Sequence, residues 1–137
     1  MVVLAATITT ITACGGSGGG GGAAPQSGNN TPPAQWVAGQ FLPEETFFAR
    51  CAAPRTDTDP VTGQALHPDV AGSVLDENNW LRSWTNDSYL WYEEILDQDP
   101  ALFADPLAYF DELRTVALTP TGNLKDRFHF TANTEEW

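Results

Sequence analysis

The stretch from Asp76 to Asp97 constrains the fold of this chain more than any other. Three of the five tryptophans of the 137-residue sequence lie in it, and with one isoleucine they are spaced by four, seven and four residues: Trp80, Trp84, Trp91 and Ile95. That spacing places them on one face of an α-helix, and large rings at helical spacing usually form the core of a small domain. We therefore expect a helix from Glu77 to Leu96, capped by Asp76, with its tryptophan face buried.

The other faces of this helix differ in character. Arg82 and Glu93 fall on the side opposite the tryptophans, whereas Tyr89 and Leu90 lie outside the apolar stripe and indicate a second covered face. One interpretation is that all these aromatic residues belong to the core. The other is that Tyr89, Leu90 and Tyr92 dock a further domain or a protein partner.

The first fourteen residues are typical of an export signal. Residues 2–13 are apolar or threonine, a run that is too short to span a bilayer but suits the core of a signal peptide. The run ends in Ile-Thr-Ala before Cys14, and this resembles a bacterial lipobox, in which the cysteine becomes the lipidated first residue of the mature protein. We expect a signal peptide over residues 1–14 with lipid on Cys14. The alternative is a cleaved signal peptide with an incidental cysteine.

Residues 15–42 are rich in glycine and proline. Such a segment cannot bury enough apolar surface to offset the entropy lost on ordering, so we expect a disordered, flexible tether. A tether behind a lipid anchor holds a folded body away from a membrane. The sequence therefore predicts a protein of the cell envelope, lipid-anchored and facing the periplasm or the exterior.

The charged residues mark the folded part of the chain. All 18 acids and six bases follow residue 43 and give a net charge of −12, and eight acids with no base lie between Arg82 and Arg114. A body this acidic is repelled by nucleic acid and by anionic lipid surfaces. We expect no nucleic-acid partner, and membrane contact only through the anchor.

Residues 43–137 are long enough for one small domain. Its first helix is expected from Pro43 to Ala52, with Phe47, Phe48 and Cys51 on the inner side. If Cys14 carries lipid, Cys51 has no partner in this chain. It is then either a buried thiol or half of a disulfide whose other half is missing.

Metal and cofactor sites are not expected. The polar residues from Asp57 onward alternate like the start of a calcium loop, but the sixth place is Thr62 rather than glycine and the twelfth is Pro68 rather than an acid. His67 and His129 are far apart, and no cysteine accompanies either of them.

A second helix begins after Asp105, which caps it, with Pro106 in the first turn. Its apolar residues follow helical spacing: Tyr109, Phe110, Leu113, Val116 and Ala117. Residues 124–130 then alternate as a short or edge strand, with His129 at the surface between two buried rings. The expected fold is mainly α, with about three helices and a short C-terminal strand behind the tether.

The last residues contain a further helix start. Thr134 can cap, and Glu135 and Glu136 occupy the first turn, just before the sequence stops at Trp137. We therefore expect the domain to be incomplete at its C-terminus.

Several of these segments together resemble a known family. WLRSWTNDSYLWYEE, DPLAYFDEL, TPTGNLKDRFHF and TEEW, with the Cys51–Arg55 segment, are similar to the N-terminal region of bacterial C-terminal processing peptidases, the tail-specific serine proteases. The resemblance is closest to exported lipoprotein members with a glycine-rich tether. It implies a PDZ domain and a peptidase domain with a serine nucleophile and a lysine base, both downstream of this chain.

No catalytic residue can be assigned within the chain. Lys125 is its only lysine, and no serine lies at a spacing that a Ser–Lys pair would use. We expect the isolated chain to cleave no peptide. Two functions remain: the tethered leader of an exported serine peptidase, or a self-sufficient small envelope lipoprotein that binds a protein partner.

Overall fold

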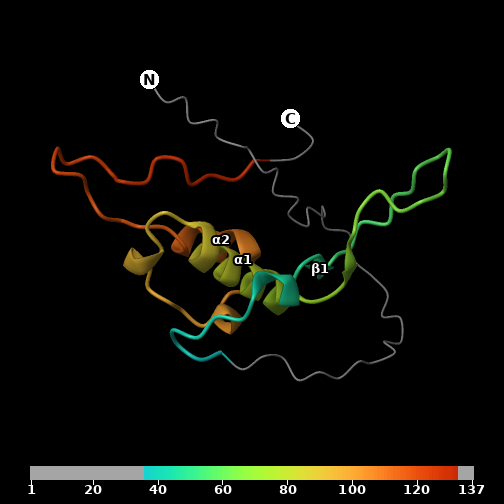
Figure 1. Ribbon diagram of the computed structural model, residues 1–137, viewed down its shortest axis with the longest axis horizontal. Coiled ribbons are helices and arrows are strands. Elements are labelled where there is room, and N and C mark those ends of the chain that lie inside the picture. Colours follow the sequence, from blue (N-terminus) through green and yellow to red (C-terminus); the bar gives the residue numbers. More distant parts are fainter. Residues whose placement is uncertain (1–35, 133–137) are drawn as a thin grey trace.

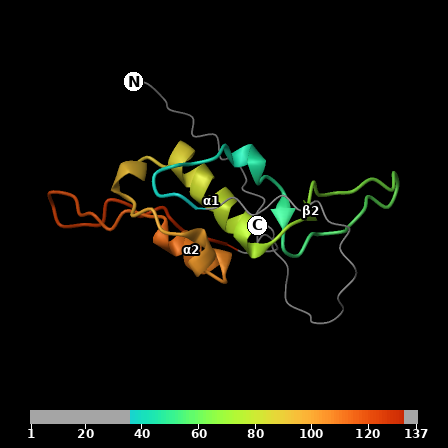
Figure 2. The same ribbon diagram turned by 90° about the horizontal axis from the view of Figure 1, so that it is seen from below.

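The computed structural model describes residues 36–132 as a small, mainly helical domain, which confirms the expected fold class. Two α-helices, α1 (Val74–Ser88) and α2 (Pro106–Glu112), pack against each other at its centre. Two extended arms project from this centre in opposite directions (Figures 1 and 2). None of the described helices is long and apolar enough to cross a membrane. The expected signal peptide, Cys14, the expected tether before Trp36 and the expected helix start at Thr134 lie outside the described residues.

Helix α1 starts one turn before the predicted position. The Ser73 hydroxyl accepts a hydrogen bond from the Asp76 backbone N–H at 3.1 Å and donates one to the Asp76 carboxylate at 2.7 Å, so Ser73 is the cap. The helix ends at Ser88, not Leu96, and Tyr89 is extended. The prediction of one helix to Leu96 was wrong because Asn86, Asp87 and Ser88 are weak helix formers that compete for backbone hydrogen bonds.

The buried face of α1 is polar rather than aromatic. Its residues follow helical spacing and are at most 7 % exposed: Asn78, Asn79, Arg82, Ser83 and Thr85. The Asn78 amide donates to the carbonyls of Pro100 and Phe103 at 3.0 and 2.9 Å. Trp80 and Trp84 stack with ring centroids 5.7 Å apart but remain partly exposed. The expectation that the tryptophan face forms the core was therefore wrong, because polar side chains occupy the interior instead. Asn78 Oδ1 and Thr85 Oγ1 are buried there without a hydrogen-bond partner among the described residues.

The predicted helix from Pro43 to Ala52 is absent from the described structure. A single 3₁₀ turn, η1 (Glu44–Thr46), is followed by strand β1 (Arg50–Cys51), which pairs in parallel with β2 (Val70–Ala71). Phe47 and Cys51 are buried as expected, but Phe48 is exposed. An α-helix is broken here because Ala49 adopts a positive φ of 59°.

Helix α2 begins where it was predicted to begin but ends earlier than predicted. The Asp105 carboxylate accepts from the Leu107 N–H at 3.0 Å, with Pro106 in the first turn. Tyr109 and Leu113 are buried, as their spacing predicted, whereas Val116 is 80 % exposed because the helix has already ended at Glu112. Before it lie two more 3₁₀ turns, η2 (Tyr92–Glu94) and η3 (Pro100–Leu102).

The predicted strand over residues 124–130 is not formed. Within the described chain this segment contributes only one isolated bridge, between Leu118 and Leu124. The burial is also the reverse of the expectation, because Phe128 and Phe130 are exposed while the His129 side chain is only 7 % exposed. His129 is buried because its ring stacks on the Phe110 ring, with the two ring centroids 3.8 Å apart. Its Nε2 also lies 2.7 Å from the Phe110 carbonyl oxygen.

Candidate functional site

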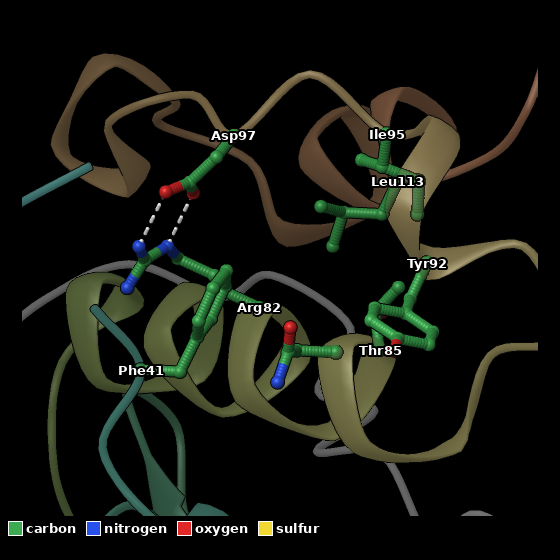
Figure 3. A pocket seen from close by; sticks show the side chains of 8 residues that line it. Phe41, Arg82, Thr85, Tyr92, Ile95, Asp97 and Leu113 are labelled. Carbon is green, nitrogen blue, oxygen red and sulfur yellow. Dashed lines mark hydrogen bonds and ion pairs between the residues drawn. The ribbon is translucent and has the colours of Figure 1, made fainter. Parts of the chain in front are cut away.

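Arg82 joins three segments at one point on α1 (Figure 3). Its guanidinium donates two parallel hydrogen bonds of 2.6 Å to the Asp97 carboxylate, beyond η2. It also donates to the carbonyls of Gln40 and Val37 at 2.9 and 3.2 Å and lies 4.2 Å from the centre of the Phe41 ring. Residues 36–42, which the sequence assigned to the flexible tether, are thus fastened to α1.

The charge of Asp97 is stabilised by this arrangement. Partial burial by itself would raise the pKa of Asp97. The hydrogen bonds from Arg82 and from the Gly39 N–H at 2.7 Å outweigh this effect and hold the pKa below its usual value. A cavity of about 320 Å³ lies beside this pair, lined by Trp36, Phe41 and Phe47 among others. Because the Arg82 guanidinium already has four partners on the protein, it offers no free charge to a ligand.

A second polar centre fastens the residues after α2. The Tyr89 hydroxyl donates to the buried Asp126 carboxylate at 2.6 Å and accepts from the Thr115 N–H at 3.1 Å. Burial and the bond to Asp126 raise the pKa of Tyr89 to about 12. The same carboxylate accepts from the backbone N–H groups of Phe128 and His129 at 2.8 and 3.1 Å. These bonds hold the pKa of Asp126 below its usual value against the effect of burial.

The Glu94 carboxylate adds a third connection beside this centre. It accepts hydrogen bonds from the Lys125 ammonium and from the Thr115 hydroxyl, and the first of these is the larger reason that the pKa of Glu94 is lowered. The only lysine of the chain is therefore held by a carboxylate. Among the described residues, no group of His, Cys, Asp and Glu side chains could hold a metal ion.

The predicted docking residues separate into two kinds. Tyr89 is half-buried, and its hydroxyl is hydrogen-bonded to Asp126 and Thr115. Leu90, in contrast, is 76 % exposed and Tyr92 is 48 % exposed. Docking of a domain or partner on Leu90 and Tyr92 stays a prediction.

Sequence reasoning missed a larger exposed set after α2. We call residues 115–132 the C-terminal arm; its large apolar side chains are all at least half exposed: Val116, Leu118, Leu124, Phe128 and Phe130. The alternation of residues 124–130 predicted one buried strand face with Leu124, Phe128 and Phe130 on it, and Val116 was expected on a buried helix face. The sequence holds no signal that His129 would be buried in place of the two phenylalanines.

Cys51 has no exposed surface and is disulfide-bonded. The alternative of a buried free thiol at this residue is therefore wrong. Lipid on Cys14 stays a prediction.

Comparison with known families identifies the helical part of the chain. Residues 76–129 match the family described as the Peptidase S41 N-terminal domain. These residues are similar to an S41 N-terminal domain. The match starts in the first turn of α1 and ends at His129, so it contains α1 from Asp76 onward, α2 and the bonds that Tyr89 and Glu94 make to the C-terminal arm.

The match confirms the resemblance to the N-terminal region of C-terminal processing peptidases, and it indicates that this domain is part of a peptidase of that family. It covers less than half of the chain, leaving out residues 36–75 with η1 and the sheet. No curated protein and no solved structure matches this chain.

Proposed function

We propose that this chain is the N-terminal leader of an exported, membrane-tethered serine peptidase of the C-terminal processing type. The match of residues 76–129 to the S41 N-terminal domain is the observation that carries this proposal. Proteolysis by a serine nucleophile and a lysine base belongs to a downstream domain. The leader does not supply that base, because its only lysine, Lys125, is bound to Glu94.

The leader's role is to hold and position the domains that follow. Arg82 fastens residues 36–42 to α1, and Tyr89 fastens the C-terminal arm to the end of the same helix. Both ends of the described domain are thus fixed to one rigid element, so a tether on one side and further domains on the other are kept at a defined separation. The exposed side chains of Leu90 and Tyr92 support contact with such a domain.

The size and activity of the native product test the proposal. An antibody to residues 76–97 is used to detect the product in envelope fractions and to precipitate it for a peptidase assay. We expect a band several-fold heavier than 14.8 kDa and serine-dependent cleavage by the precipitate. A band at or below 14.8 kDa without activity would replace the proposal by the alternative, a small envelope lipoprotein that binds a protein partner.

Membrane tethering needs a separate test, because an exported peptidase need not be lipidated. Cells are fed an alkyne fatty acid, and the product is examined for label and for membrane association. We expect both in the intact protein, loss of both in Cys14→Ser, and retention of both in Cys51→Ser. A thioether to lipid would exclude the Cys14 sulfur from any disulfide, so an unlabelled product that changes mobility on reduction would end the lipid proposal.

A further inference from the structure

The C-terminal arm is an extended projection with a well-fixed base. Figures 1 and 2 show it leaving the helical centre on the side opposite to the arm formed by residues 55–69. Its tip turns at Gly122, with hydrogen bonds of 2.7 Å from the Thr119 N–H to the Asn123 carbonyl and 2.9 Å from the Gly122 N–H to the Thr119 carbonyl. Its base is held by the bonds from Tyr89 and Glu94. The arm is therefore a built feature rather than a loose end.

Several of the exposed side chains of this arm are large and apolar. Five large ones are between 51 % and 80 % exposed, and two of them are the phenylalanines Phe128 and Phe130. Two exposed phenylalanines on an anchored segment are unfavourable for an isolated domain, because burying such rings away from water is favourable. Exposed apolar groups of this kind mark contact surfaces.

The charge of the arm differs from the charge of the rest of the protein. Of the six cations in the chain, Arg55, Arg82 and Lys125 have carboxylate partners. The other three are exposed, and no ion pair involves them within residues 36–132: Arg50, Arg114 and Arg127. Arg114 lies at the base of the C-terminal arm and Arg127 lies on it. A protein with a net charge of −12 thus presents two cations without an ion-pair partner in the described residues, one at the base of the arm and one, Arg127, next to Phe128 in the sequence.

We propose that the C-terminal arm is a docking surface for an acidic, apolar segment of a protein partner. The two arginines supply charge complementarity to acids, and the exposed side chains supply apolar contact area. An anionic membrane and nucleic acid share the negative charge but extend over large surfaces, so the acidic body beside the arm would be repelled by them. A short acidic segment can reach the arm alone. The proposal rests on exposure and charge, and so does not depend on the peptidase assignment.

The test measures binding of the full chain to a fluorescein-labelled peptide in which Glu alternates with Leu, by anisotropy at low salt. Two comparison peptides replace Glu by Lys, or Leu by Ser. The arm variants are Arg127→Glu and Phe128→Ser/Phe130→Ser. The matched control for Arg127→Glu is Arg50→Glu. The matched control for the double phenylalanine variant is Val61→Ser/Leu66→Ser on the opposite arm. All three control residues are exposed. Near-ultraviolet circular dichroism checks that each variant is folded.

We expect the Glu-Leu peptide to bind the intact chain and both controls alike, with affinity roughly tenfold lower for each arm variant. The two comparison peptides should bind weakly to all proteins, and added salt should weaken the Glu-Leu complex. Absence of binding, equal binding by arm variants and controls, or equal binding of the Lys peptide would overturn the proposal. So would arm-dependent dimers in sedimentation, or arm-dependent binding to phosphatidylglycerol vesicles, because each identifies another occupant.

Discussion

The hydroxyl of Tyr89 donates a hydrogen bond of 2.6 Å to the carboxylate of Asp126, which lies 37 residues further along the chain. Tyr89 is the first residue after α1, and Asp126 is nearly completely buried at the base of the C-terminal arm. This one bond therefore connects the end of the long helix to the last part of the described domain. The same hydroxyl accepts from the Thr115 N–H, so the first and last parts of the arm are both hydrogen-bonded to it.

Tyr89→Phe should loosen the C-terminal arm without unfolding the helices. The substitution removes a hydrogen bond to a buried carboxylate and leaves the Thr115 N–H without its acceptor, for which we expect a loss of about 1–3 kcal/mol in the free energy of unfolding. Hydrogen exchange of residues 115–130 should accelerate. The matched control is Tyr92→Phe, because the Tyr92 hydroxyl reaches only Glu93 at 3.5 Å. Equal exchange in both variants would contradict the role given to Tyr89.

Arg82→Lys should destabilise the domain although it keeps the positive charge. Lysine cannot donate two parallel bonds to Asp97 while also reaching the carbonyls of Val37 and Gln40. Breaking a buried ion pair costs about 3–5 kcal/mol when one partner is removed, and we expect Arg82→Ala to approach this value in urea unfolding, with Arg82→Lys between it and the unaltered protein. Arg50→Lys, at an exposed cation, should change nothing measurable. If Arg82→Lys were as stable as the unaltered protein, the charge alone would hold residues 36–42.

Protonation of Asp69 should make the free energy of unfolding of the domain fall at low pH. Two side-chain hydrogen bonds from Arg55, at 2.7 and 2.8 Å, lower the pKa of Asp69 to about 2. The unfolded carboxyl has a pKa of about 3.9. Since the pKa of Asp69 is lower in the folded than in the unfolded protein, its ionised carboxylate adds to the free energy of unfolding. This stabilisation is complete above about pH 4 and is lost as the pH falls towards about 2. Urea unfolding across this range should show a steeper decline for the unaltered protein than for Asp69→Asn; parallel curves would contradict the assignment.

Gly72→Ala should disrupt the two-stranded sheet. A Cβ added at Gly72 would lie 2.7 Å from the backbone carbon of Arg50, closer than atoms can approach, so β1 and β2 would have to separate. The comparison variant is Gly63→Ala, where the added carbon meets no atom within 4 Å and the only cost is the positive φ of 70°, about 1–2 kcal/mol. We expect a larger loss of stability for Gly72→Ala in urea unfolding. A smaller loss than for Gly63→Ala would show that the strands shift apart easily.

Local chemistry was enough to predict several features. Asp105 and Pro106 start α2 because a capping carboxylate and a fixed φ act within one turn, and the spacing of Tyr109 and Leu113 identified its buried side. The helical segment around Trp80 was found, and its sequence carried the resemblance that the family match over residues 76–129 confirms.

Tertiary structure decided which face of each element is buried. The sequence alone favours burial of the tryptophans, but Arg82 and Asn78 are buried because distant groups, the Asp97 carboxylate and the carbonyls of Pro100 and Phe103, accept hydrogen bonds from their side-chain N–H groups. His129 and Asp126 displace two phenylalanines from the interior for the same reason. Hydrophobic periodicity records only the apolar content of a face, and the partners that make a polar face suitable for burial lie far along the chain. Capping and spacing thus predicted where α2 begins, whereas long-range hydrogen bonds decided which side of α1 faces inward.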